Sequence, residues 1–159
     1  MKHRIIAVFI AGALSAPLSA SAQLAYASNE KDGTITVIDT AKDEAVASIK
    51  AGKTPRGMAA SVDGKRLYVS DQKSNALRII DLATRAEASV IDLGESPEGV
   101  GRSPDGKWVV VAIEEDHQVF FVDVATGKIA FRVKVEGENP EHAVFSPDSK
   151  WVFVSAEES

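Results

Sequence analysis

The 159-residue sequence contains no cysteine and lacks the familiar short catalytic motifs. The absence of cysteine excludes disulfides, thiolate metal sites and cysteine nucleophiles. The sequence also has no phosphate-binding glycine loop, zinc-binding helix motif or nucleophile elbow. No window shows the apolar periodicity of an amphipathic helix. These absences favour a β-sheet protein that is stabilised by packing alone.

Long hydrophobic runs are missing as well. The apolar stretch at 5–14 has about ten residues, whereas roughly 20 are needed to span a bilayer. Because Lys2 and Arg4 precede it and the small residues at 20–22 follow it, residues 1–22 have the pattern of a secretory signal peptide. An uncleaved anchor is the alternative, which the short apolar run disfavours. We therefore predict an exported protein, periplasmic in a bacterium and free of the membrane after cleavage.

The sequence has fewer basic than acidic residues. Without the predicted signal peptide, 16 Lys and Arg stand against 23 Asp and Glu, a net charge near −7. An acidic balance of this size disfavours nucleic acid and anionic membrane surfaces as partners. A protein partner or a small ligand is the expected alternative.

What the sequence does contain is a repeat of 42 residues. Three sets of equivalent positions, two of aspartate and one of proline, recur in phase along it, and one additional residue, expected within 128–136, interrupts the last interval. A fixed period of this length is typical of proteins in which each repeat packs against its neighbours. The recurring positions are Asp39, Asp81 and Asp123; Pro55, Pro97 and Pro140; and Asp63, Asp105 and Asp148.

Each repeat opens with a hairpin that has clear turn residues. In the middle copy, Pro104 fixes φ at the first turn position, Asp105 can bond the local backbone and Gly106 can adopt a positive φ. Ser149 replaces this glycine in the last copy, which predicts a less favourable turn. The copies are TPRGMAASVDGKRLYV (54–69), SPEGVGRSPDGKWVVV (96–111) and NPEHAVFSPDSKWVFV (139–154).

Four short strands can be assigned to one period. The third strand is apolar on both faces, since Leu77 and Ile79 point to one side and Ile80 to the other, so it must be covered on both faces. Four-stranded antiparallel units that each pack between two neighbours are the blades of a β-propeller. A parallel β-helix is the alternative. In the second repeat the strands are expected at 57–61, 66–70, 76–81 and 87–93.

The length predicts an incomplete ring. The 137 residues after position 22 amount to about 3.3 repeats, whereas closed propellers have about four to eight blades. We expect an open arc that aggregates or oligomerises alone, and further repeats beyond Ser159. The predicted units are a signal peptide at 1–22 and a partial β-propeller at 23–159, with blades at 24–52 (partial), 55–94, 97–137 and 140–159 (partial).

The repeated strings SVDGKRLYVSD (61–71), SPDGKWVVVA (103–112) and SPDSKWVFVSA (146–156), with VIDT (37–40) and IIDLAT (79–84) between them, resemble the YVTN-type, WD40-like β-propeller repeat family. Within it, TPRGM, SPEGV and NPEHAVFSPDSKWVFVSAEES are similar to β-propeller proteins associated with PQQ-dependent catabolism. This resemblance implies an exported bacterial protein that is accessory to alcohol oxidation by quinoprotein dehydrogenases.

The loops that follow the three prolines are the better candidates for a binding site. In propellers the connection into each innermost strand faces the mouth of the central channel, where Arg56, Glu98, Glu141 and His142 can line one site. The alternative is that these side chains only solvate a rim. His142 replaces a glycine and can ligate a metal or heme iron or move a proton, or it can be a simple surface histidine.

Other recurring residues have structural explanations. The aspartates that recur as Asp39, Asp81 and Asp123 can form a metal ring, but each ends a strand where it can cap the next turn, which is favoured. Trp108 and Trp151 recur at equivalent strand starts and are expected to pack blades rather than to form a ligand cage.

Three functions compete. The favoured one is a non-catalytic binding or scaffold propeller with no cofactor, acting through its loop face or channel. The second is a redox propeller similar to the heme d1 domain of periplasmic nitrite reductases, with His142 as axial ligand. The third is a metal-dependent propeller hydrolase in which Glu98 and Glu141 bind Ca²⁺.

Overall fold

The computed structural model describes residues 23–158, so the predicted signal peptide lies outside the described residues. This part of the chain is built from strands and one 3-10 helix, η1 (Gln72–Ser74). It contains no helix long and apolar enough to cross a bilayer. The strands are β1 (Leu24–Asn29), β2 (Thr34–Asp39), β3 (Glu44–Lys50), β4 (Pro55–Ala60), β5 (Arg66–Asp71), β6 (Ala76–Asp81), β7 (Ala86–Asp92), β8 (Pro97–Arg102), β9 (Trp108–Ile113), β10 (Gln118–Asp123), β11 (Lys128–Lys134), β12 (Glu138–Phe145) and β13 (Val152–Glu158).

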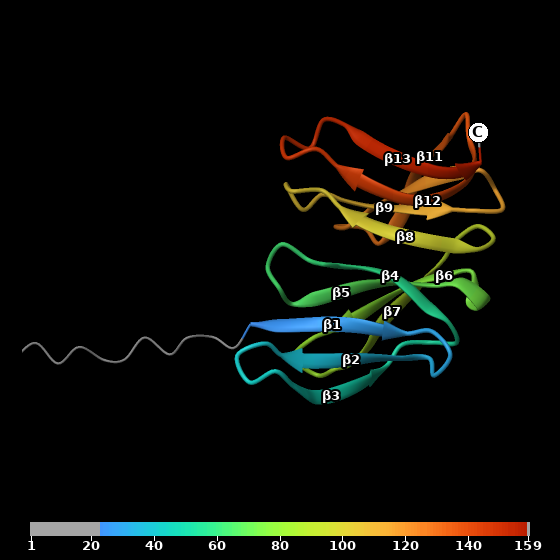
Figure 1. Ribbon diagram of the computed structural model, residues 1–159. Coiled ribbons are helices and arrows are strands. Elements are labelled where there is room, and N and C mark those ends of the chain that lie inside the picture. The colour runs from blue at the N-terminus through green and yellow to red at the C-terminus, as the bar shows by residue number, and fades with distance from the viewer. Residues whose placement is uncertain (1–22, 159) are drawn as a thin grey trace, which may run out of the picture.

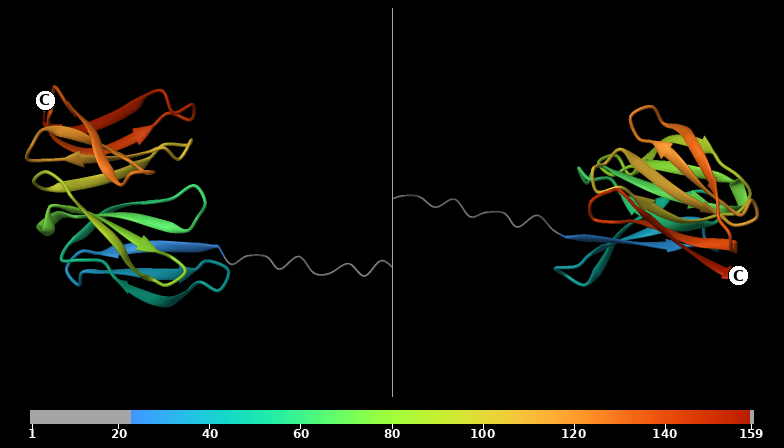
Figure 2. Two further views of the ribbon diagram at one scale, coloured as in Figure 1. Left: turned by 180° about the vertical axis from the view of Figure 1, so that it is seen from behind. Right: turned by 90° about the horizontal axis from the view of Figure 1, so that it is seen from above.

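The strands form four antiparallel sheets that follow one another along the chain. Two sheets are complete, with orders β4-β5-β6-β7 and β8-β9-β10-β11, and the flanking sheets are β1-β2-β3 and β12-β13. Figure 1 shows the sheets as successive layers, from the blue N-terminal sheet to the red C-terminal one, and Figure 2 shows them from behind and from above. The predicted fold is confirmed as an all-β, propeller-type open arc whose four-stranded blades are called blades 2 and 3 below, between partial blades 1 and 4.

Apolar side chains fill the spaces between successive blades. Ile80 of β6 and Val69 of β5 are buried against blade 1, while Leu77 and Ile79 of β6 are buried against blade 3. The strand β6 is thus covered on both faces, as its sequence predicted. On blade 4, Trp151 and Phe153 are 67% and 63% exposed.

The turn chemistry holds in all three hairpins. The Ser61 hydroxyl donates a 2.6 Å hydrogen bond to Asp63, and Ser103 and Ser146 do the same for their aspartates. The third turn position is left-handed in every copy, with φ of 67° at Gly64, 74° at Gly106 and 62° at Ser149. The expected strain at Ser149 has a compensating contact, because its hydroxyl accepts a 3.2 Å hydrogen bond from the backbone of Asp105.

The recurring aspartates cap turns, as predicted. Asp39 accepts a hydrogen bond from the backbone of Ala41, Asp81 from Ala83 and Thr84, and Asp123 from Thr126. Such contacts satisfy backbone donors just after the third strand of each blade. They give these residues a structural role.

The additional residue of the last repeat is placed differently from the prediction. The Val135 amide bonds the His117 carbonyl just as the Leu93 amide bonds Asn75, so β11 is still in phase. The extra residue therefore lies between Val135 and Pro140, in the connection to β12 or at the start of that strand, and this stretch overlaps the predicted segment 128–136 only at its end. A bulge does not absorb it, because all three outer strand pairs have the same register shift.

Candidate functional site

A β-bulge follows each proline, where the sequence suggested a loop. Pro55 pairs with Asp71 but Met58 pairs with Val69, so β4 advances by three residues where β5 advances by two. The same shift follows Pro97 in β8, and a register shift follows Pro140 in β12. A bulge re-aims the side chains at the extra position. In this chain the bulges carry Arg56, Glu98 and Glu141.

Adjacent inner strands approach each other closely at these bulges. A Cβ atom on Gly57 would lie 2.4 Å from the Glu98 carbonyl oxygen, and one on Gly99 would lie 2.4 Å from that of Glu141. Only glycine permits this approach of backbones. It brings the predicted site residues of blades 2, 3 and 4 side by side. His142 occupies the position in blade 4 that is equivalent to Gly57 and Gly99, and it is exposed.

Serines of the second strands hold the bulges in place. The Ser28 hydroxyl donates to the Arg56 carbonyl at 3.0 Å, and the Ser70 hydroxyl donates to the Glu98 carbonyl at 2.5 Å. Ser70 also accepts a 2.8 Å hydrogen bond from the Gly57 amide, so one hydroxyl ties two blades together. These serines recur 42 residues apart, but their role depends on contacts between blades that the sequence does not display.

The centre of the site is a buried carboxylate with two partners. Glu98 is 2% exposed, its Oε2 lies 2.7 Å from Nε of Arg56, and its Oε1 accepts a 2.6 Å hydrogen bond from Gln72. Burial raises the pKa of Glu98 to about 7, although Arg56 acts in the opposite direction and the nearby Glu141 and Glu114 charges raise it further. Glu98, predicted to line the channel mouth or, alternatively, only to solvate a rim, is therefore an internal carboxyl that can hold a proton near neutral pH.

A second layer of polar groups surrounds this centre. Gln72 also donates to the Ser96 hydroxyl at 3.1 Å, and Ser96 donates to Glu114 at 2.7 Å. One carboxylate oxygen from each of Glu114, Glu141 and Glu157 lies within 4.8 Å of the other two. The arrangement concentrates negative charge around a single arginine.

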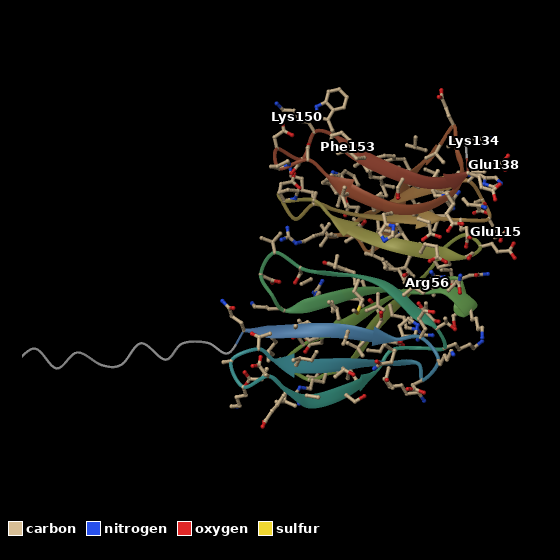
Figure 3. All side chains as sticks on the ribbon, in the orientation of Figure 1. Arg56, Glu115, Lys134, Glu138, Lys150 and Phe153 are labelled. Atoms are coloured by element: carbon tan, nitrogen blue, oxygen red, sulfur yellow. The ribbon has the colours of Figure 1, made fainter. Side chains whose placement is uncertain are left out.

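The four predicted residues line one polar cavity of about 190 Å³, together with Glu30, Gly57 and Gly99. Arg56 is 33% exposed and lies at the side of the molecule where η1 is found (Figure 3). Among residues 23–158, the lining contains no serine, threonine or lysine that could act as a nucleophile. Its chemistry suits recognition of a cationic or hydrogen-bonding group.

Sequence reasoning missed a fourth ladder that contributes to this site. Glu30, Gln72, Glu114 and Glu157 are spaced by 42, 42 and 43 residues. The first three directly follow the second strand of their blade, and Glu157 is the next-to-last residue of β13. The same spacing that identified the prolines could have found them. That they lie next to the bulged residues could not be predicted without the strand pairing. The start of each first strand pairs with the end of the second strand, as Pro55 does with Asp71 and Pro97 with Ile113.

No family model matches this chain, and no curated protein does. A solved structure, hydrazine synthase from Kuenenia stuttgartiensis, is similar with a TM-score of 0.80 and 23% sequence identity. The similarity covers 84% of this chain and 38% of that one, so the chain spans well under half the length of its structural neighbour. The likeness supports the propeller fold and carries no argument on activity.

Proposed function

We propose that this chain belongs to an exported, non-catalytic β-propeller that binds a partner protein or small ligand at the channel mouth. The observation that carries the proposal is the Arg56–Glu98–Gln72 network, which joins blades 2 and 3 at one polar cavity. The resemblance of the repeats suggests the context, namely a quinoprotein system for alcohol oxidation in the bacterial periplasm.

The charge of the site indicates what it recognises. Glu30, Glu98 and Glu141 line the cavity against one guanidinium, that of Arg56. Because Glu98 is bonded on both oxygens and Oε1 of Glu30 lies 3.7 Å from Nε of Arg56, Glu141 is the acidic group of the lining left to meet an incoming group. A cationic group of the partner, such as a lysine or an amine, fits this arrangement.

Surface plasmon resonance against a purified quinoprotein alcohol dehydrogenase tests this function. We expect binding that weakens with salt and falls at least about tenfold in Glu141→Gln, since rim charges govern such encounters. Lys128→Gln, an exposed change on β11, is the matched control and should leave binding intact. Absence of binding, or equal binding by Glu141→Gln, would contradict the proposal.

The carboxylates favour one other candidate, a Ca²⁺-dependent site. The oxygens of Glu114, Glu141 and Glu157 are close enough to share one cation, whereas the predicted ligand Glu98 is held by Arg56 and Gln72. A rise in melting temperature with millimolar CaCl₂ that is lost in Glu114→Gln would favour this candidate. No shift would leave the binding propeller as the better interpretation.

The heme-bearing candidate has a separate test. His142 is exposed and is the only histidine among the residues that line the cavity. We expect no tight heme complex in absorbance spectra between about 350 and 700 nm, because a single exposed imidazole gives weak ligation. A stoichiometric band that disappears in His142→Ala would instead support the redox propeller.

A further inference from the structure

A second cleft lies at the opposite end of blades 2 and 3 from the channel-mouth site. It is about 340 Å³ in volume and is lined by residues of the hairpin turns of blades 2 and 3, of the strands on either side of these turns, and by Val124 after β10. Gln72 of the channel-mouth site follows the end of β5, whereas Arg66 and Tyr68 of the cleft lie near its start. We propose that this cleft binds a small, flat apolar anion, of which an aromatic carboxylate is the representative class.

The walls of the cleft are aromatic and apolar. Tyr68 is buried in the core between blades 2 and 3. Trp108 also lines the cleft, although it packs against the core between blades 3 and 4 and makes an edge contact with Phe131, whose ring centre is 5.5 Å away. Val62 and Val124 complete the apolar lining. A volume above about 300 Å³ with such walls is in the range of small-molecule sites.

Two guanidinium groups stand at this apolar surface. Arg66 and Arg102 both line the cleft and are exposed, and neither forms an ion pair within residues 23–158. The side chain of Arg102 has one weak contact, from Nη1 to the Ser103 carbonyl at 3.4 Å. Guanidinium groups pair with carboxylates through two parallel hydrogen bonds and also stack on rings.

One carboxylate, Asp63, is also part of the lining, and its bonds are internal. It accepts hydrogen bonds from the Ser61 hydroxyl at 2.6 Å and the Lys65 amide at 3.1 Å. Hydrogen bonds from Ser61 and Lys65 lower the pKa of Asp63, with a smaller effect of the Lys65 and Arg66 charges. The cleft therefore has two cations and one anion, a net positive charge in an otherwise acidic protein.

The paired arginines are specific to this junction between blades. At the junction of blades 3 and 4, the repeat places Trp108 and Phe145 at the positions equivalent to Arg66 and Arg102. At the junction of blades 1 and 2, it places Leu24 and Ala60 there. Because the fold is built at those junctions without either guanidinium, the pair is not required by blade packing.

Tryptophan fluorescence provides the test. The sequence has two tryptophans, so Trp151→Phe leaves Trp108 as the single reporter. Titration with 4-nitrobenzoate should give saturable quenching, and neutral 4-nitrobenzamide should bind at least about tenfold more weakly, since it lacks the charge-assisted hydrogen bonds. Arg102→Ala, which installs the residue found at the equivalent position of blade 2, should weaken 4-nitrobenzoate by about tenfold.

The controls separate this site from general adsorption. Lys128→Gln removes a positive charge outside the cleft and should not change the affinity. Calorimetric titration of the unsubstituted protein compares 4-nitrobenzoate with 4-nitrobenzamide again, in case Trp151→Phe disturbs the fold. Quenching without saturation, equal affinity for acid and amide, or an unchanged affinity in Arg102→Ala would each overturn the proposal. None of these outcomes affects the channel-mouth site, whose residues are separate.

Discussion

Blades 2 and 3 have the same four-stranded topology but opposite chemistry at one set of three equivalent positions. In blade 2, the fully buried Asp71 accepts hydrogen bonds from Arg78 at 2.8 Å and from the Thr54 amide at 2.8 Å, and Arg78 also pairs with Glu87. In blade 3 the equivalent residues of this triad are Ile113, Phe120 and Ile129. All three polar residues are exchanged together.

This concerted exchange shows how a buried polar group is accommodated in a repeat. Charges removed from water need complete pairing, and a partly satisfied network costs more than an apolar core. Blade 2 pairs its carboxylate fully, whereas blade 3 buries Ile113 and Phe120 in the core between blades. The loop held by Asp71 in blade 2 is held in blade 3 by the Asn75 side chain, which accepts a 3.2 Å bond from the Ser96 amide.

The largest effect is expected from breaking the polar version of the pair. Asp71→Ala leaves Arg78 and the Lys53 and Thr54 amides without their acceptor, so we expect a loss of about 3–5 kcal/mol in the free energy of unfolding. Urea denaturation followed by circular dichroism measures it. Ile113→Val at the equivalent position should cost only about 1 kcal/mol. Equal losses would mean that the network is no more sensitive than the apolar core.

The bulged residue after each proline extends the comparison to the site, because Arg56 of blade 2 corresponds to Glu98 of blade 3. The pKa of Glu98 is raised from 4.5 to about 7, so the folded state holds this proton more tightly than the unfolded state does. Its contribution to stability is complete below pH 4.5 and is lost as the pH rises through about 7. The total change is on the order of 3 kcal/mol.

Glu98→Gln should therefore flatten the dependence of unfolding free energy on pH between about 4.5 and 7.5. Urea midpoints across that range give the slope for each protein. The capping aspartates, whose pKa values are lowered from 3.8, contribute only at lower pH and in the opposite direction. A slope that survives unchanged in Glu98→Gln would show that another group titrates there.

A direct exchange of the two chemistries should have a smaller effect. Asp71→Ile, Arg78→Phe and Glu87→Ile together give blade 2 the residues of blade 3, so no charge remains buried without a partner. We expect this triple variant to recover most of the stability lost in Asp71→Ala, to within about 2 kcal/mol of the original protein. If the triple variant is as unstable as Asp71→Ala, the loop at Thr54 needs the carboxylate itself.

The comparison also shows what the sequence could predict. The 42-residue period and the turn residues were enough to identify the blades, the turns and the capping aspartates, since these depend on residues close together in the chain. The burial of Glu98 was missed because it depends on Gln72 and Arg56, which come from another blade. The bulges were missed because a bulge is defined by counting residues against a partner strand. The Asp71–Arg78 pair joins two strands. The only sign of it in the sequence is that the position of Asp71 is occupied by an apolar residue, Ile113, in the next repeat.

The smallest effect is expected on the apolar version of the pair. Arg132 lies over Phe120, with its guanidinium carbon 4.6 Å from the ring centre, and the equivalent residue in blade 2 is Val90 beside Arg78. Arg132→Val should cost about 0.5–1 kcal/mol, the usual size of an exposed cation–π contact. Urea denaturation of Arg132→Val, Phe120→Leu and the double variant measures the coupling. A coupling energy near zero would mean that blade 3 is stabilised by burial of Phe120 alone, so that nothing in it substitutes for the ionic network of blade 2.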